Sequence, residues 1–427
     1  MKQLLPKSGF ARNALIILSG SALAQAIPIV VSPILTRLYT PSDFGLLALY
    51  TAVVSILAAA ATGRYEAAVM LPEESRDAQQ VVALSAITGL LICCLLLLLV
   101  AVLNAEISAL LSAPHISNWL YLAPVSIMLI GTYQTLNYWL IRQKEFRKSA
   151  VNKLSQTSFT VIPSILMGAL QMPGGLLVGY ITGWLAGNLT GYRQARRTGF
   201  APKNVDWTGI KINAVRYQDM PKYSALPALL DGASLAIPVI LVNSFFLGAA
   251  AGFFALTRQV ILGPLSLIST SVSQVLFQHV VEKKNQGLPL LPEVAGIMWR
   301  LAALAVALAL LAILGAPEFF ALVFGEEWRV AGDYARILAC AYAIRFVVSP
   351  LSVVFLALER VKLGSMWQIL YFVVLLPLFF LGHVSIQQFL FIYAGLEIAV
   401  YLIYLGMVLH IVRAYDRDLI DNRVGQS

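Results

Sequence analysis

The sequence predicts an all-α polytopic membrane protein, with twelve transmembrane helices in two six-helix lobes around a central cavity. Three observations support this prediction. Of the 427 residues, 59% are hydrophobic and only 12% are charged, whereas a soluble domain carries about 25% charged residues. The apolar residues form runs of about 20, which is the length that a helix needs to cross a bilayer. The basic residues between these runs favour one side of the membrane.

The first apolar run follows a basic segment and has no small-residue cleavage site, so we interpret it as a retained span and not as a signal peptide. The other runs follow with short connections, apart from one basic linker. The twelve predicted spans are residues 13–36, 44–62, 79–103, 118–141, 154–172, 174–192, 222–247, 249–277, 293–314, 332–357, 364–382 and 387–411.

The distribution of basic residues predicts the orientation of these spans. With a cytoplasmic N-terminus, 25 of the 30 Lys and Arg residues fall in cytoplasmic segments, as the positive-inside rule requires. Only Arg37, Arg329 and Arg336 fall on the opposite side, and Arg258 and Arg345 fall inside spans. We therefore expect both termini to be cytoplasmic. Topology and anionic lipid headgroups explain the net charge of +9, and no nucleic-acid partner is needed.

Two short similarities predict an internal repeat. AIPIV at 26–30 resembles AIPVI at 236–240, and GLLALYT at 45–51 resembles GFFALTR at 252–258. Six spans per half give both halves the same orientation, as in the parallel repeats of some alternating-access transporters. The predicted parts are an N-terminal lobe (1–192), a basic cytoplasmic linker (193–221), a C-terminal lobe (222–412) and a cytoplasmic tail (413–427).

Four ionisable residues at mid-span depth form the first candidate site: Asp231, Arg258, Arg345 and Glu397. Each belongs to a polar stripe, a row of polar residues three or four positions apart that share one face of a helix. Charged side chains inside a membrane are costly and mark substrate or ion pathways. One interpretation is therefore a binding site with its charge partners. The simpler alternative is that the arginines pair with the carboxylates in two neutral buried bridges.

Aromatic residues on the same stripes are weaker candidates. Tyr342 precedes Arg345 by three residues, and Tyr393 and Tyr401 flank Glu397 at four-residue spacing. They are either ligand contacts or interfacial anchors. Trp184 belongs to an uncharged stripe in the first half.

The segment GRYE contributes a further pair, Arg64 and Glu66, at the cytoplasmic end of the second span. Two interpretations of this pair are possible: a surface ion pair, or a gate or latch between the lobes. Pro28 and Pro238, at matching positions of the repeat, would bend their helices and are candidate hinges.

Several kinds of chemistry have no signature in this sequence. No P-loop motif, no H-E-x-x-H motif and no paired-cysteine metal motif occurs, so we expect neither a cofactor nor a metal site. Cys93, Cys94 and Cys340 all lie in apolar runs. The predicted non-cytoplasmic loops are too small for a catalytic domain, so we do not expect an enzyme.

Three segments resemble the Wzx-type polysaccharide flippases of the multidrug/oligosaccharidyl-lipid/polysaccharide (MOP) exporter superfamily. They are LTRLYTPSDFG (35–45), GRYEAAVMLP (63–72) and FGEEWRVAGDYARIL (324–338). The length and the repeat agree, so the resemblance covers essentially the whole chain. It implies a bacterial inner-membrane flippase that moves an undecaprenyl-pyrophosphate-linked oligosaccharide to the periplasmic leaflet for assembly of O-antigen, capsule or exopolysaccharide.

The resemblance also implies roles for the candidate residues. Arginine matches phosphate oxygens bidentately, so Arg258 and Arg345, with Arg37 at the outer rim, would bind the pyrophosphate. Asp231 or Glu397 would compete for these arginines or carry a coupling proton. Four aromatic residues are candidate glycan contacts: Tyr342, Tyr393, Tyr401 and Trp184. The implied partners are the lipid-linked oligosaccharide and membrane lipids, with a polysaccharide polymerase and a chain-length regulator as candidates.

The main alternative is a drug/cation antiporter of the same superfamily. A cationic substrate favours unpaired acidic residues, whereas here two arginines match two acids. A polymerase or ligase would need a large outer loop, and the sequence predicts none. A non-transporting polysaccharide-assembly protein leaves the mid-span charges unexplained. A major-facilitator sugar transporter is disfavoured because the loop after the second span lacks the G-x-x-x-D-R-x-G-R-R pattern.

Overall fold

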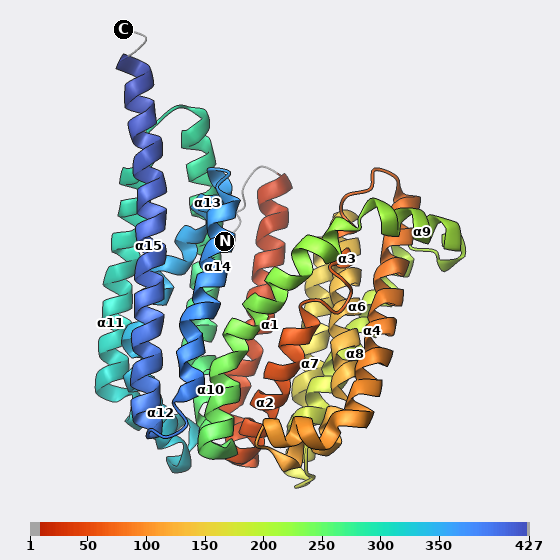
Figure 1. Cartoon of the computed structure of the whole chain (residues 1–427), viewed down its shortest axis with the longest axis vertical. Helices are drawn as coiled ribbons and strands as arrows, with labels where there is room; N and C mark the ends of the chain where they lie inside the picture. The colour runs from red at the N-terminus through yellow and green to blue at the C-terminus, as the bar shows by residue number, and fades with distance from the viewer. Residues whose placement is uncertain (1–8, 425–427) are drawn as a thin grey trace. The chain divides into compact units, whose positions relative to one another are not determined.

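The computed structural model describes residues 9–424, and all regular secondary structure within them is helical. The chain divides into two compact units, Met1–Ala255 and Leu256–Ser427. Figure 1 shows the helices of both units, and each unit is described below by itself. The expected all-α polytopic fold is confirmed.

The first unit is a bundle of long helices joined by short turns. The long helices are α1 (Gly9–Leu38), α2 (Pro41–Ala58), α4 (Ser75–Leu110), α6 (Ala123–Arg142), α7 (Phe146–Ala169), α8 (Gly175–Arg197) and the first part of α10 (Ala225–Asn285). Shorter elements are α3 (Tyr65–Ala68), α5 (Ser117–Leu120), α9 (Trp207–Arg216) and a π-helical turn, η3 (Met220–Ser224).

The second unit contains the rest of α10 and the helices that follow it. They are α11 (Leu291–Phe324), α12 (Arg329–Val348), α13 (Val353–Ala357), α14 (Val361–Leu375) and α15 (Ile386–Val424). Asp416 of α15 holds the start of α11, because its carboxylate accepts hydrogen bonds from the backbone N–H groups of Leu290 at 2.7 Å and Leu291 at 2.9 Å. These bonds satisfy N–H groups that the first turn of a helix cannot pair internally.

All twelve predicted spans lie largely within these helices. Among the residues that the structure describes, seven helices are long and apolar enough to cross a membrane, and the number of twelve crossings stays a prediction. The seventh and eighth predicted spans fall in the single element α10, where Leu247 interrupts the helix with φ 74° and ψ 166°. A continuous helix of 61 residues would be about 90 Å long, far more than a bilayer needs, so this break is where the backbone can change direction.

Small residues bring α7 and α8 of the first unit into close contact. Glycines recur at every fourth position of α8, and a Cβ at Gly179 or Gly183 would collide with Ser164 or Thr160 of α7. Small residues at this spacing allow two membrane helices to approach closely. The same helix pair carries Trp184, one of the predicted site residues.

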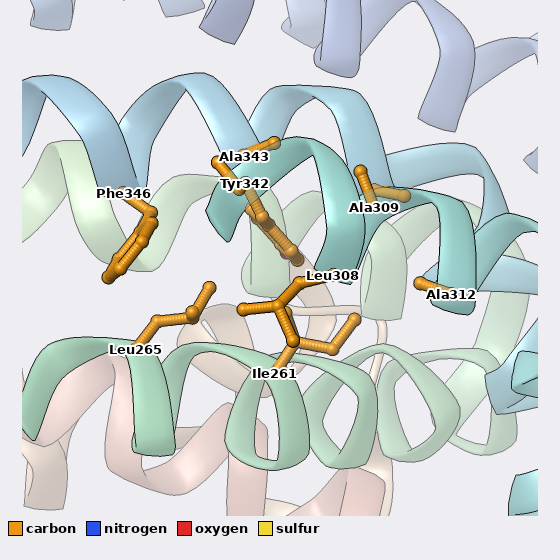
Figure 2. A pocket seen from close by; sticks show the side chains of 10 residues that line it. Ile261, Leu265, Leu308, Ala309, Ala312, Tyr342, Ala343 and Phe346 are labelled. Atoms are coloured by element: carbon orange, nitrogen blue, oxygen red, sulfur yellow. The ribbon is translucent and has the colours of Figure 1, made fainter. Parts of the chain in front are cut away.

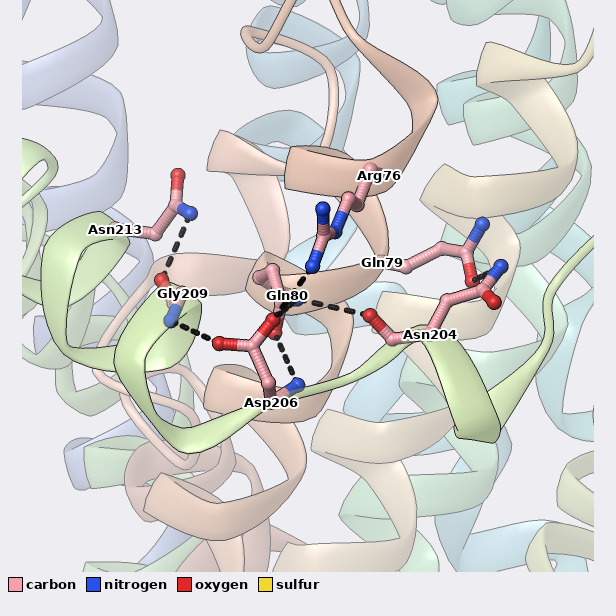
Figure 3. Close-up of polar contacts among 7 residues, drawn as sticks. All are labelled: Arg76, Gln79, Gln80, Asn204, Asp206, Gly209 and Asn213. Atoms are coloured by element: carbon pink, nitrogen blue, oxygen red, sulfur yellow. Dashed lines mark hydrogen bonds and ion pairs between the residues drawn. The ribbon is translucent and has the colours of Figure 1, made fainter.

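A network of polar side chains fixes α9 to the start of α4, as Figure 3 shows. Asp206 caps α9, because its carboxylate accepts a hydrogen bond from the Gly209 N–H at 2.6 Å. The same carboxylate accepts from Arg76 and from Gln80 on α4, both at 3.1 Å. Gln80 also donates to the Asn204 carbonyl at 3.0 Å. The predicted linker is therefore ordered and attached to the first unit.

The Asp206 network predicts a pH dependence for α9. The hydrogen bond from Gly209, followed by the contacts of Arg76 and Gln80, holds the pKa of Asp206 below its ordinary value. A lowered pKa in the folded state stabilises the structure above the ordinary value of about 3.9, and the stabilisation is lost as the pH falls through the lowered value. We expect hydrogen-exchange protection of α9 to stay constant from about pH 7 to pH 5 and to fall below about pH 4.

Asp206→Ala should lose this protection already at pH 7, because the cap and the contact with Arg76 both disappear. Asp219→Asn, which changes an exposed carboxylate next to η3, is the matched control and should behave like the unmodified chain. Equal protection in the two variants would refute the assignment to Asp206.

Candidate functional site

Glu397 on α15 is the centre of a buried polar cluster in the second unit. Its side chain is 0% exposed. The carboxylate oxygen Oε1 accepts hydrogen bonds from the hydroxyls of Tyr371 and Tyr393, the second at 3.1 Å. Tyr393 lies one helical turn before Glu397, as its spacing predicts, whereas Tyr371 comes from α14. One oxygen of the carboxylate is thus held by two hydroxyls from two helices.

The other oxygen of Glu397 faces Arg345 on α12. The Arg345 Nη1 atom lies 3.8 Å from Glu397 Oε2, and the Arg345 side chain is 21% exposed. This distance is an ion pair but too long for a hydrogen bond. Within residues 24–419, neither Nη1 nor Oε2 has a hydrogen-bond partner, although both atoms are buried. Buried polar atoms are nearly always paired, so this ion pair has capacity for a further ligand.

Aromatic rings surround the ion pair. The guanidinium carbon of Arg345 lies 5.7 Å from the ring centre of Tyr401, within the range of a cation–π contact. Trp367 of α14 stacks on Tyr371 with ring centres 5.3 Å apart and packs against Tyr401 at 5.6 Å. The rings hold the hydrogen-bonding hydroxyls and the guanidinium in fixed positions.

Trp367 and Tyr371 were not among the predicted site residues. They stand four residues apart in the segment WQILY, which places them on one face of α14. An aromatic pair at this spacing within an apolar span was the signal in the sequence. From the sequence alone, the pair does not differ from an ordinary aromatic contact in an apolar core.

Tyr342 of α12 occupies a different environment. Its side chain is buried and, as far as the described residues show, its hydroxyl makes no hydrogen bond. It lines an apolar cavity of about 30 Å³ between α10, α11 and α12. Figure 2 shows Tyr342 and Phe346 pointing toward Ile261 and Leu265 of α10. A cavity of this size has no room for a sugar, so a glycan contact by Tyr342 would have to involve another face of its ring or its hydroxyl.

Arg258 of α10 belongs to the same unit and is partly buried. It lies close enough to the hydroxyls of Tyr342 and Tyr393 to interact electrostatically with both. The second unit therefore brings together two of the predicted phosphate-binding arginines, one predicted charge partner and three predicted tyrosines around Glu397. Asp231 belongs to the first unit, and its partnership with Arg258 stays a prediction.

The first unit carries Trp184 and Arg37 at separate places. Trp184 on α8 packs edge-on against Tyr133 and Tyr180, with ring centres 5.2 and 6.1 Å apart. The ammonium of Lys153 lies 5.9 Å from its ring centre. Arg37 is exposed at the end of α1, where it donates to the carbonyl of Pro33 at 3.4 Å.

Arg64 and Glu66 form an ion pair of 3.2 Å, with side chains 32% and 3% exposed. The interpretation as a surface ion pair is wrong for Glu66, because its carboxylate is buried and accepts a hydrogen bond from Thr62. Arg64 stands in the left-handed region at φ 64°, a conformation that non-glycine residues adopt at a cost. The turn between α2 and α4 is thus built around a buried carboxylate. A gate or latch role stays a prediction.

The chemistry available around Glu397 is binding and proton transfer. The cluster offers a guanidinium with a free donor, a carboxylate with a free acceptor and two tyrosine hydroxyls. Such groups suit a ligand that carries an anionic oxygen, and a buried carboxylate can also take up a proton. Within the described part of the chain, no three His, Cys, Asp or Glu residues gather in one place.

Solved structures with the same fold cover almost the whole chain. The lipid II flippase MurJ in an inward closed conformation superimposes with a TM-score of 0.74 at 11% identity, over 95% of this chain and 91% of MurJ. An inward-facing multidrug resistance transporter of the MATE family in the MOP superfamily gives a TM-score of 0.68 at 12% identity, over 93% and 99% of the two chains. The MOP fold is therefore shown.

Sequence comparison connects the chain to polysaccharide assembly. It is 25% identical over 139 residues to the teichuronic acid biosynthesis protein TuaB of Bacillus subtilis (strain 168). That match spans 33% of this chain and 29% of TuaB, less than a third of that protein's length. The family described as "Polysaccharide biosynthesis protein" matches residues 34–333. Since this match covers well over half of the sequence, the chain belongs to the polysaccharide biosynthesis protein family.

Proposed function

We propose that this protein is a flippase that moves an undecaprenyl-pyrophosphate-linked oligosaccharide from the cytoplasmic to the periplasmic leaflet by alternating access. The cargo would serve the assembly of a cell-surface polysaccharide. Family membership supports the link to polysaccharide biosynthesis. The MOP fold supports transport, and the MurJ structure with the same fold is named a lipid II flippase.

The ion pair between Arg345 and Glu397 is the observation that supports this proposal most strongly. Its separation of 3.8 Å leaves a buried donor and a buried acceptor without hydrogen bonds. A phosphate oxygen bound by Arg345 would satisfy the donor in a charge-assisted hydrogen bond, the strongest kind that a side chain makes. Glu397 would then lose its charge partner.

This proposal assigns roles to most of the candidate residues. Arg345 and Arg258 bind the pyrophosphate, with Arg37 as a contact at the rim. Glu397 competes for Arg345 after the cargo leaves or carries the coupling proton, and Asp231 is the alternative carrier. Trp184, Tyr393 and Tyr401 remain proposed glycan contacts. The same proposal places the chain in the bacterial inner membrane with both termini in the cytoplasm.

Deletion and complementation test this function. A strain without the gene should lose its surface polysaccharide and accumulate the lipid-linked oligosaccharide on the cytoplasmic leaflet. A plasmid copy should restore the polysaccharide and clear the accumulated intermediate. If deletion leaves the polysaccharide intact and instead raises sensitivity to cationic drugs, the antiporter alternative is correct and the flippase proposal is wrong.

A further inference from the structure

A second pocket of the second unit lies between the end of α10 and the start of α11. Its volume is about 350 Å³, within the usual size range of small-ligand sites. The residues that line it sit on one face of each helix, at spacings of three or four residues. They are Ser271, Val272, Val275 and His279 of α10, and Glu293, Ile297, Arg300 and Leu301 of α11.

One end of this pocket is charged. Glu293 pairs with His279, Nδ1 to Oε1 3.2 Å, and with Lys283, Nζ to Oε2 2.9 Å. The carboxylate is thus already matched by two basic groups. Arg300 is exposed, and no carboxylate of the described residues lies within 4.0 Å of its guanidinium. The charged end therefore presents an uncompensated cation to whatever enters the pocket.

Apart from Ser271, the rest of the lining is apolar. Val272, Val275, Ile297 and Leu301 form this part of the wall. Leu301 is buried in a core cluster with Val272 and Ile297 packed against it, so the apolar wall is firmly built. A ligand that fits both parts has an anionic group joined to a hydrocarbon portion.

The position along the helix identifies the environment of the pocket. Residues 301–317 of α11 contain no charged side chain, and this apolar run starts directly after Arg300. Trp299, beside it, is 69% exposed, and exposed tryptophans mark the boundary between headgroups and hydrocarbon. We therefore expect Arg300 to lie at the depth at which lipid phosphates are found, with the apolar wall facing the first carbons of the lipid chains.

We propose that this pocket binds the phosphate group of a membrane lipid, with Arg300 as the principal contact and His279 and Lys283 at its charged end. The guanidinium can hold two phosphate oxygens at once. The lipid would be either an anionic phospholipid of the bilayer or a polyprenyl-pyrophosphate, which share this chemistry. The inference concerns a site apart from the Glu397 cluster and does not depend on the proposed function.

Native mass spectrometry of the full-length chain, released from bilayer nanodiscs, tests the proposal. The nanodiscs contain phosphatidylcholine alone, or phosphatidylcholine with either phosphatidylglycerol or undecaprenyl pyrophosphate. We expect the unmodified protein to retain one molecule of an added anionic lipid, either phosphatidylglycerol or undecaprenyl pyrophosphate. Arg300→Gln should lower the retention of that lipid about tenfold, which is the effect of losing one hydrogen bond to a charged group. Val275→Trp, which fills the pocket without changing a charge, should lower retention as well.

Arg413→Gln removes an exposed arginine of α15 outside the pocket and serves as the matched control. Retention of phosphatidylglycerol that depends on Arg300 assigns the site to bilayer phospholipid. Retention of undecaprenyl pyrophosphate alone, with the same dependence, assigns it to a polyprenyl lipid. The proposal is overturned if Arg300→Gln and Val275→Trp retain as much lipid as Arg413→Gln. This experiment measures lipid binding alone, so its result does not depend on whether the protein is a flippase.

Discussion

Replacing Glu397 with glutamine is expected to destabilise the folded protein by about 3 kcal/mol. Glutamine keeps the size of the side chain and can still accept hydrogen bonds from Tyr371 and Tyr393, but it removes the charge that faces Arg345. Breaking a buried ion pair from one side costs about 3–5 kcal/mol. The lower end applies here because Arg345 is 21% exposed and retains some access to water.

Thermal unfolding of the purified protein in one detergent measures this effect. Glu327→Gln, which changes an exposed carboxylate of the same unit, should melt like the unmodified chain. The double variant Arg345→Gln/Glu397→Gln should regain most of the lost stability, because no charge is left without its partner. A Glu397→Gln variant as stable as Glu327→Gln would show that the ion pair does not hold these helices together.

Replacing Arg345 with glutamine is expected to reduce surface polysaccharide at least tenfold. Each hydrogen bond to a charged group contributes about 1.5–3 kcal/mol, and about 1.4 kcal/mol corresponds to a factor of ten in binding. Arg345 is partly buried, faces Glu397 and contacts the ring of Tyr401, so glutamine cannot replace its charge at this position. Arg258→Gln should act in the same direction, because Arg258 lies near Tyr342 and Tyr393 of the same cluster.

Complementation of a deletion strain, with quantified surface polysaccharide, checks this result. Arg336→Gln is the matched control on the same helix, since Arg336 is largely exposed and 4.0 Å from Asp333. Membrane levels of each variant must equal those of the unmodified protein, so that insertion is not the cause. Normal amounts of surface polysaccharide with both Arg258→Gln and Arg345→Gln would show that these arginines do not bind the pyrophosphate of the cargo.

The fold could be predicted from the sequence because a bilayer constrains it strongly. Every backbone polar group in hydrocarbon must be paired internally, so the apolar runs had to be helices, and the structure places all twelve largely within helices. The break in α10 at Leu247 could not be predicted, since nothing about a leucine indicates a backbone with positive φ. The attachment of α9 through Gln80 and Asp206 depends on side chains far apart in sequence, which one sequence cannot pair.

The candidate site could be predicted where charge stood out against an apolar background. Arg345, Glu397, Tyr393 and Tyr401 were found by helical spacing around charged residues, and the structure brings them together. Tyr371 was missed because a tyrosine among apolar residues does not differ from an ordinary core residue. The contact of Lys153 with Trp184 could not be predicted, because it joins α7 to α8 and one sequence does not pair residues that are far apart along the chain.

Flipping in proteoliposomes tests the central claim most directly. The purified protein is reconstituted with a fluorescent undecaprenyl-pyrophosphate-linked oligosaccharide, and a membrane-impermeant reagent reports how much cargo reaches the outer leaflet. The account predicts that the unmodified protein and Arg336→Gln accelerate this movement well above that in protein-free vesicles. It also predicts that Arg345→Gln reduces the rate at least tenfold. Movement no faster than in protein-free vesicles, or equal rates for Arg345→Gln and Arg336→Gln, would contradict it.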